Sequence, residues 1–240
     1  MEWRDEGLVI GVRRYGESSA IVEAMTRQHG RHLGLVRGAR SQRLHSVLQP
    51  GNTLGLVWRA RLDEQLGQFA VEPLKLRAGR LIASGMALAG VAWLGALLRL
   101  LPERDSHEAL FDPLTLIADH LDAPEIAPPL LARFEMRMLQ ECGFRLDLDT
   151  CAATGARENL VYVSPKSGRA VSAAAGAPYR ERLLPLPAFL RGAGAAPGAG
   201  DIEGAFKLTR FFLERDLFGP RGLAMPDARR AFLAAALRGG

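Results

Sequence analysis

The chain has 240 residues, of which 48% are hydrophobic and 24% charged. This composition argues against intrinsic disorder because it supplies enough apolar material for a core. The net charge is +5, and residues 1–80 hold 13 basic and 8 acidic side chains, so the whole excess lies in the first third. A local basic surface attracts polyanions, which favours nucleic-acid binding.

The first third of the chain reads as short strands separated by turns. Apolar or alternating runs predict strands at residues 7–12, 20–25, 31–37, 54–62 and 68–71. Five short strands with turns at this spacing suit a small closed barrel, and the OB-fold is the obvious candidate. We therefore expect a first domain at residues 1–78.

The pattern changes to helices after Pro73, so we expect a helical domain at residues 79–240 and an α+β multidomain chain. Asp112-Pro113 resembles an N-cap followed by a first-turn proline, and Pro128-Pro129 predicts a helix that ends near Gly143. Two further helices are expected at 204–218 and 226–237. The uncharged stretch 81–98 is rich in small residues, which indicates a buried helix rather than a membrane span.

The start of the chain is too polar for a secretory signal, and the two cysteines, Cys142 and Cys151, are too few for a disulfide framework. We therefore expect a cytoplasmic protein with reduced thiols. If it binds DNA, it would be associated with the nucleoid.

Five arginines fall within a 17-residue span that contains no acidic residue. Arg31 and Arg37 have even spacing and so share one face of a strand. Aromatic residues nearby are few, which favours contacts with the phosphate backbone over base stacking. The predicted DNA-binding residues are those of the span and two that precede it: Arg13, Arg14, Arg27, Arg31, Arg37, Arg40 and Arg43.

Several motifs follow one another in an order and spacing that closely resemble the RecO family of bacterial recombination mediators, over essentially the full chain. They include Gly7-Leu8-Val9-Ile10, Arg14-Tyr15-Gly16-Glu17, Val36-Arg37-Gly38-Ala39-Arg40, Leu48-Gln49-Pro50-Gly51, Arg133-Phe134-Glu135-Met136-Arg137-Met138-Leu139 and Val163-Ser164-Pro165-Lys166-Ser167-Gly168-Arg169. The resemblance implies an N-terminal OB-fold and a helical domain with a zinc-finger-like insertion. It also implies binding of single- and double-stranded DNA, strand annealing, and cooperation with RecR to load RecA onto DNA coated by single-stranded-DNA-binding protein (SSB).

Some members of this family carry two Cys-x-x-Cys pairs, the spacing of a structural zinc site. Here the first pair reads Cys151-Ala152-Ala153-Thr154, and the second would fall near Ser172-Ala173-Ala174-Ala175. One thiolate of four remains, so we expect a degenerate insertion, at about residues 143–185, that binds no zinc. We expect no other cofactor.

SSB ends in an acidic, apolar tail, and a site for it needs a basic residue beside an apolar pocket. Arg133 and Arg137 beside Phe134 and Met138 are the candidates, with helix packing as the alternative explanation. No catalytic motif is evident, and we expect a non-enzymatic protein. The alternatives left open are an OB-fold module that binds RNA and a metal-dependent nuclease that uses scattered carboxylates.

Overall fold

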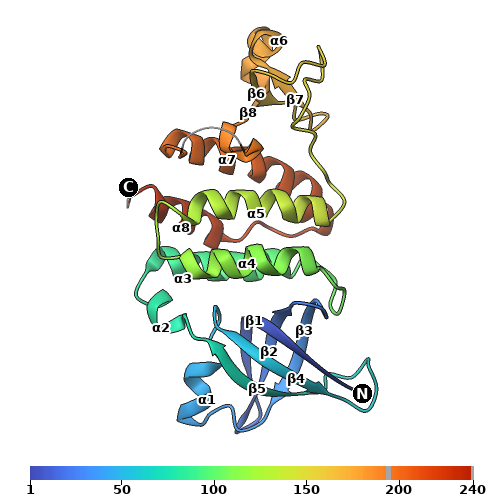
Figure 1. The fold of residues 1–240 in the computed structure, drawn as a ribbon, viewed down its shortest axis with the longest axis vertical. Helices are drawn as coiled ribbons and strands as arrows, with labels where there is room; N and C mark the ends of the chain where they lie inside the picture. Colours follow the sequence, from blue (N-terminus) through green and yellow to red (C-terminus); the bar gives the residue numbers. More distant parts are fainter. Residues whose placement is uncertain (193–195, 239–240) are drawn as a thin grey trace. The chain divides into compact units, whose positions relative to one another are not determined.

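The computed structural model describes residues 1–192 and 196–238. The chain divides into two compact units, Met1–Ala123 and Pro124–Gly240. The first holds a five-stranded sheet and helices, and the second is mostly helical (Figure 1). The predicted mixed α+β class is therefore confirmed.

The five predicted strands are all present, and most extend beyond their predicted ends. They are β1 (Glu2–Tyr15), β2 (Ser19–Thr26), β3 (Arg31–Val36), β4 (Thr53–Arg59) and β5 (Gln68–Lys75). They close into a barrel in the order β1-β2-β3-β5-β4, with β3 and β5 parallel and the other pairs antiparallel. The short helix α1 (Gln42–Val47) lies between β3 and β4 in the sequence.

The barrel interior is filled by alternate residues of its strands, as a period of two requires. On β3, His32, Gly34 and Val36 are buried, whereas the residues between them are partly exposed. Any other residue at position 34 would force the ring of Phe69 to move, because its Cβ would lie 2.3 Å from that ring. Trp58 belongs to the same core, and its side chain is 1% exposed.

Three helices complete the first unit: α2 (Ala78–Leu81), α3 (Gly85–Leu98) and α4 (Glu108–His120). The uncharged stretch 81–98 is not one helix, because Ser84 caps α3 by accepting a hydrogen bond from the amide of Ala87. Most of α3 is buried, including Trp93 and Leu97, as predicted. Among the described residues, no helix has the length and apolar character needed to cross a membrane.

The predicted helix start at Asp112-Pro113 is wrong. Helix α4 begins at Glu108, and Pro113 lies inside it. Pro113 is the sixth residue of α4 and removes one backbone hydrogen bond of the helix, but the earlier start places Leu110 and Phe111 in the core at 0% and 1% exposure. Burial of these two side chains thus outweighs the local proline signal.

The change from strands to helices occurs at the expected place, since β5 ends at Lys75 and α2 begins at Ala78. The first compact unit nevertheless continues to Ala123. One reason is Arg77, which donates from Nε to Asp119 of α4 at 2.6 Å and from Nη1 to Thr53 of β4 at 2.8 Å. A domain boundary near residue 78 stays a prediction.

The second unit is built around α5 (Ala127–Glu141), which begins with the predicted Pro128-Pro129. Gly143 follows its end with a φ of +90°, a left-handed conformation that favours glycine. The last predicted helix is confirmed as α8, and α7 begins before the predicted residue 204. The remaining elements are β6 (Leu160–Val163), β7 (Ala170–Ser172), α6 (Ala173–Gly176), η1 (Ala177–Arg182), β8 (Leu184–Pro185), η2 (Ala188–Arg191), α7 (Ala199–Phe212), η3 (Leu213–Phe218), η4 (Gly219–Arg221) and α8 (Asp227–Ala236).

Strands β6, β7 and β8 form a separate three-stranded sheet in the order β7-β6-β8. This small sheet occupies the part of the chain where the sequence predicts an insertion, at about 143–185. Its core includes Val163 and Ala170, both fully buried. A zinc-finger-like character of this segment stays a prediction.

Candidate nucleic-acid interface

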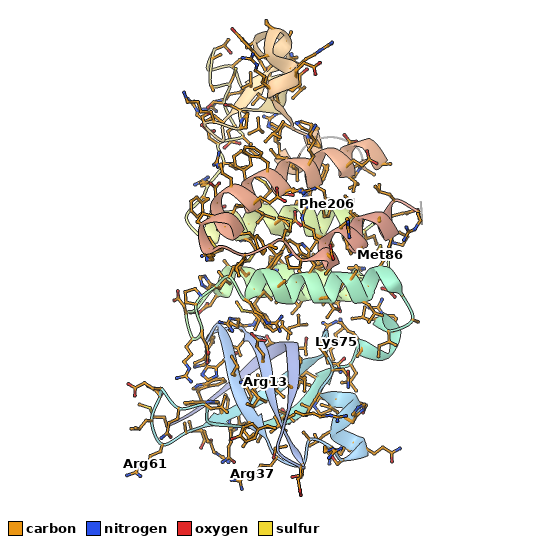
Figure 2. The ribbon with its side chains drawn as sticks, turned by 180° about the vertical axis from the view of Figure 1, so that it is seen from behind. Arg13, Arg37, Arg61, Lys75, Met86 and Phe206 are labelled. Carbon is orange, nitrogen blue, oxygen red and sulfur yellow. The ribbon has the colours of Figure 1, made fainter. Side chains whose placement is uncertain are left out.

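The strand register brings basic residues from distant parts of the sequence to one edge of the barrel. Arg14 of β1 pairs with Ala20 of β2, and Ala20 pairs in turn with Val36 of β3. The end of β1 therefore lies across β2 from the end of β3, and Arg37 follows directly. Figure 2 shows Arg13 on the side of the barrel and Arg37 projecting from the end remote from α3 and α4.

Five of the seven predicted arginines are exposed and have no carboxylate partner among the described residues. Arg40 donates to the backbone carbonyl of Glu17 at 2.7 Å, which positions its side chain beside the turn between β1 and β2. A guanidinium that is not paired with a carboxylate can bind phosphate in the bidentate geometry. The five are Arg13, Arg14, Arg37, Arg40 and Arg43.

The other two predicted arginines are held in ion pairs within the first unit. Arg27 lies 2.6 Å from Glu6 and 2.8 Å from Asp112, and its guanidinium stands over the ring of Phe111. Hydrogen bonds to Asp112 and Glu6 raise its pKa further above the ordinary arginine value. These contacts join strand β1 to helix α4, so Arg27 has a structural role.

Arg31 is likewise held by contacts within the first unit. Its Nη1 donates to Glu23 at 2.8 Å, its Nε donates to the carbonyl of Leu101, and its side chain is only 16% exposed. The structure thus separates the basic span into two paired arginines and an exposed set near the loop after β3.

A pocket of about 450 Å³ lies beside this exposed set. Arg14, Arg40 and His45 contribute polar groups to it, and Val12 and Leu48 contribute apolar ones. Helix α1 positions His45, because Ser41 caps the helix by accepting from the amide of Leu44. The sequence analysis missed His45 and Gln49 as site residues, although Gln49 belongs to the Leu48-Gln49-Pro50-Gly51 motif that follows α1.

Two of the aromatic residues near the basic span are used inside the barrel. Trp3 lies between His29, at 4.1 Å between ring centroids, and Trp58, at 5.6 Å, and both contacts are stacked. Trp58 is itself buried. Tyr15, at the end of β1, is 55% exposed and leaves a ring face accessible. The structure therefore agrees with few opportunities for base stacking on aromatic rings.

The ring of His32 contacts Trp3, Trp58 and Phe69 and is buried at 3% exposure. Because this buried side chain can take up a proton, it makes the stability of the barrel depend on pH. Burial lowers the pKa of His32 to about 4, from an ordinary histidine value of 6.5. Below pH 6.5 the unfolded chain binds a proton that the folded chain excludes, so stability falls as the pH falls and levels off below 4. We expect a loss of about 2 kcal/mol between pH 7 and pH 5.

Urea unfolding of the wild type and of His32→Phe at pH 7, 6 and 5 measures this effect. Phenylalanine keeps an aromatic ring between Trp58 and Phe69 but cannot be protonated. The variant should lose less stability on acidification than the wild type. Equal losses in the two proteins would contradict the assignment.

The remaining thiol of the expected zinc site is enclosed by hydrogen-bond donors. Cys151 is 1% exposed, and its Sγ accepts from the amide of Ser172 at 3.3 Å. Hydrogen bonds from Thr154, and then from Ser172, lower the pKa of this thiol. Hydroxyl groups thus stand where further thiolates would be needed, and this donor set does not fit tetrahedral zinc. Within the described ranges, no cluster of three His, Cys, Asp or Glu side chains could hold a metal ion.

The four candidates for an SSB-tail site lie on two different faces of α5. Phe134 and Met138 are buried at 1% and 0% exposure, whereas Arg133 and Arg137 are exposed. Arg133 donates to the carbonyl of Phe189 at 2.8 Å. The structure therefore does not bring the predicted apolar pair to the surface beside the two arginines.

Comparison with known proteins gives one family over nearly the whole chain. The family model described as "Recombination protein O N terminal" matches residues 1–77, and "Recombination protein O C terminal" matches residues 84–223. The chain is 65% identical to the DNA repair protein RecO of Methylocella silvestris over 98% of this chain and 95% of that protein. It is 60% identical to the same-named protein of Beijerinckia indica, covering 98% and 94%, and 59% identical to that of Chelativorans sp., covering 99% and 96%.

Proposed function

Since the chain belongs to the RecO family of DNA repair proteins, we propose that it binds single- and double-stranded DNA through the arginine edge of its barrel. The observation that carries this proposal is the set of exposed arginines without carboxylate partners, gathered by the register of β1, β2 and β3. The strand order and the helix between β3 and β4 support an OB-type barrel, a fold that often binds nucleic acid.

Neutralisation of phosphates by this edge would also promote annealing, because two DNA strands repel each other until their charge is reduced. We propose that the protein acts with RecR to load RecA onto SSB-coated single strands, without catalysing a reaction itself. Membership in a family of DNA repair proteins supports this role and a location at the nucleoid. A strand-annealing assay on SSB-coated oligonucleotides, with and without RecR, tests it.

For the SSB tail, a groove between α7 and α8 fits the required chemistry better than Arg133 and Arg137 on α5. The groove has a volume of about 480 Å³, and Met225 and Leu233 line it together with Lys207. Its other charged lining residues are three arginines and three carboxylates: Arg210, Arg229, Arg230, Glu203, Glu214 and Asp227. An acidic, apolar peptide needs this combination of cation and apolar surface. A labelled SSB-tail peptide should lose affinity for Lys207→Glu but not for Arg137→Glu.

The two alternative functions make different predictions. An RNA-binding module would prefer RNA over single-stranded DNA of the same sequence in a competition assay. A metal-dependent nuclease would cleave DNA when Mg²⁺ is added. We expect neither result.

Reversal of charge at Arg37 and Arg40 should weaken DNA binding. Each contributes one exposed cation, and replacing both with glutamate changes the local charge by four units. We expect an affinity loss of about tenfold or more at moderate salt, and a shallower dependence of affinity on salt. Fluorescence anisotropy with a labelled oligonucleotide measures both quantities.

The matched control reverses Arg210 and Arg230, two exposed arginines of the second unit. This variant carries the same net charge as Arg37→Glu/Arg40→Glu, and it should bind DNA nearly as well as the wild type. If both variants lose affinity equally, the effect is one of net charge and the arginine edge is not the site.

A further inference from the structure

Three hollows on the first unit adjoin one another and share lining residues, and we name them together the Val12 groove. They have volumes of about 450, 370 and 440 Å³. Val12 lines all three. Gln49 and Pro50 line the first and third, and Gly11 and Arg99 line the second and third. A bound chain that follows the surface past Val12 could therefore contact all three hollows.

The chemistry of the groove changes along its length. At one end Arg14 and Arg40 supply cations. The third hollow is largely apolar, and it includes Ile82 of the α2 C-terminus and Leu88 of α3, which are 59% and 48% exposed. Large aliphatic side chains exposed to this extent beside cations offer a surface for a ligand that is both charged and flat or apolar.

The second hollow ends the groove with two more cations, Arg13 and Arg99. Arg99 is held in place, because its Nε and Nη2 donate to one oxygen of Glu23 at 2.9 and 2.7 Å. The other oxygen of Glu23 accepts from Arg31 at 2.8 Å. One carboxylate thus serves two guanidinium groups, which leaves this end of the groove positive and its arginine oriented.

We infer that the Val12 groove binds single-stranded DNA, an inference that rests on the proposed DNA-binding function. The phosphates would lie on Arg14 and Arg40 at one end and on Arg13 at the other, where Arg99, paired with Glu23, adds to the positive charge. The bases between them would pack on Ile82 and Leu88, as aliphatic side chains do when they contact unstacked bases.

The alternation of cations with an apolar section is what selects a single strand. A duplex keeps its bases paired and stacked inside, so it cannot place a base face on Ile82 or Leu88, and it contacts only the arginines. An acidic peptide could also use an apolar section flanked by cations. Cations at both ends of the groove favour a ligand that is charged along its whole backbone, as a nucleic-acid strand is.

The test replaces Ile82 with asparagine and Leu88 with glutamine in one full-length variant. Both side chains are exposed, so the fold should persist, and the unfolding temperature checks this. Affinity for a labelled single strand should fall about tenfold, in line with the contribution of one packed base. Affinity for a duplex of the same length should change less than about twofold, since the cations remain.

Leu116→Gln is the matched control, because this leucine of α4 is 47% exposed and does not line the groove. Unchanged single-strand affinity of the groove variant would overturn the inference, and so would equal losses on single strands and duplexes. Loss of binding to an acidic, apolar peptide with unchanged DNA binding would assign the groove to a peptide instead. If the wild type bound neither form of DNA, the proposed function itself would fail.

Discussion

Replacing Arg229 with leucine is expected to lower the free energy of unfolding of the second unit by about 3–5 kcal/mol, because it removes the guanidinium that pairs with the buried Glu135 carboxylate. Glu135 of α5 is 0% exposed and the Arg229 side chain of α8 is 5% exposed. The two form a bidentate pair, with Arg229 Nε and Nη2 donating to the two carboxylate oxygens at 2.9 and 2.8 Å.

The same guanidinium also joins α8 to α7. Its Nη2 donates to the carbonyl of Phe206 at 2.8 Å and to the hydroxyl of Thr209 at 2.9 Å. Thr209 donates in turn to Glu135. Leucine at position 229 would therefore break the contacts of three helices at once, and the unpaired groups would stay out of reach of water.

Urea unfolding measured by circular dichroism gives the change. Arg230→Leu is the matched control, because the neighbouring Arg230 pairs with Asp227 in an exposed position and should contribute little. The double variant Glu135→Leu/Arg229→Leu should be more stable than Arg229→Leu alone, since it removes the buried charge as well. A double variant less stable than the single one would show that packing, and not the unpaired carboxylate, governs the loss.

The sequence predicted the barrel well because each strand carries its own signal. The period of two in β3 separates His32 and Val36 from Leu33 and Leu35, but it does not indicate which face turns inward, and the structure buries the face of His32 and Val36. The Pro128-Pro129 start of α5 is similarly local. The start of α4 could not be read in the same way, since it depends on what Leu110 and Phe111 bury against in the folded unit.

The sequence could not show which of the predicted DNA-binding arginines are paired with carboxylates, because the pairing depends on the fold. Nothing near Arg27 or Arg31 in the sequence announces that the chain returns with Asp112 beside the first, or that Glu23 on the adjacent strand reaches the second. Charge counting alone therefore ranks a paired arginine and an exposed one equally. Arg40 and Arg37 differ from them because, within the described part of the chain, no carboxylate pairs with either.

For the SSB-tail candidates on α5, the sequence pattern alone already indicated which side chains are buried. Phe134 and Met138 are four residues apart and share one face of α5, as do Arg133 and Arg137. Adjacent positions on a helix point about 100° apart, so one pair can be buried while the other is exposed. The buried face is the apolar one, and helix packing explains it without a ligand.

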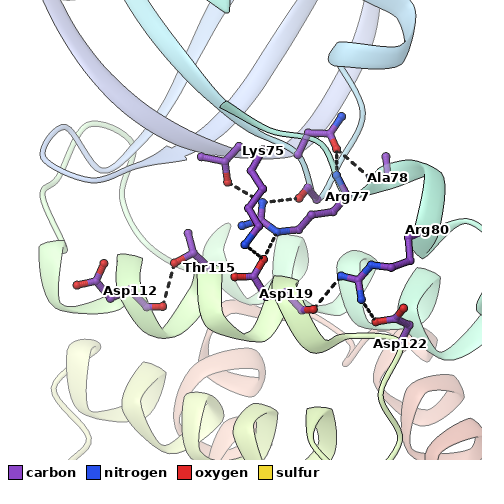
Figure 3. A network of polar contacts seen from close by, with 11 residues as sticks. Lys75, Arg77, Ala78, Arg80, Asp112, Thr115, Asp119 and Asp122 are labelled. Carbon is purple, nitrogen blue, oxygen red and sulfur yellow. Dashed lines mark hydrogen bonds and ion pairs between the residues drawn. The ribbon is translucent and has the colours of Figure 1, made fainter. Parts of the chain in front are cut away.

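Arg77 joins strands of the first unit to its helices through a network of polar contacts (Figure 3). Its side chain is 4% exposed and contacts Asp119, at 2.6 Å, together with Thr53 and the carbonyl of Gly51. Burial raises the pKa of Asp119, but hydrogen bonds from Arg77 and Lys75 outweigh it and hold the pKa below its usual value. The Asp119 carboxylate is therefore charged and depends on these cations.

Replacing Arg77 with leucine should destabilise the first unit by about 3 kcal/mol, because two buried oxygens on β4 and the loop before it lose their donor. The Asp119 carboxylate keeps Lys75 but loses its buried cation. Arg80→Leu is the control from the same network: Arg80 contacts Asp122 and the carbonyl of Asp119, but its side chain is 49% exposed. Exposed pairs contribute about 1 kcal/mol at most. Thermal unfolding of Arg77→Leu and Arg80→Leu measures whether the buried arginine stabilises the first unit more than the exposed one. A loss for Arg77→Leu no larger than that for Arg80→Leu would mean that the Arg77 contacts do not hold the barrel to α4, and that the Arg27 ion pairs and apolar packing do so instead.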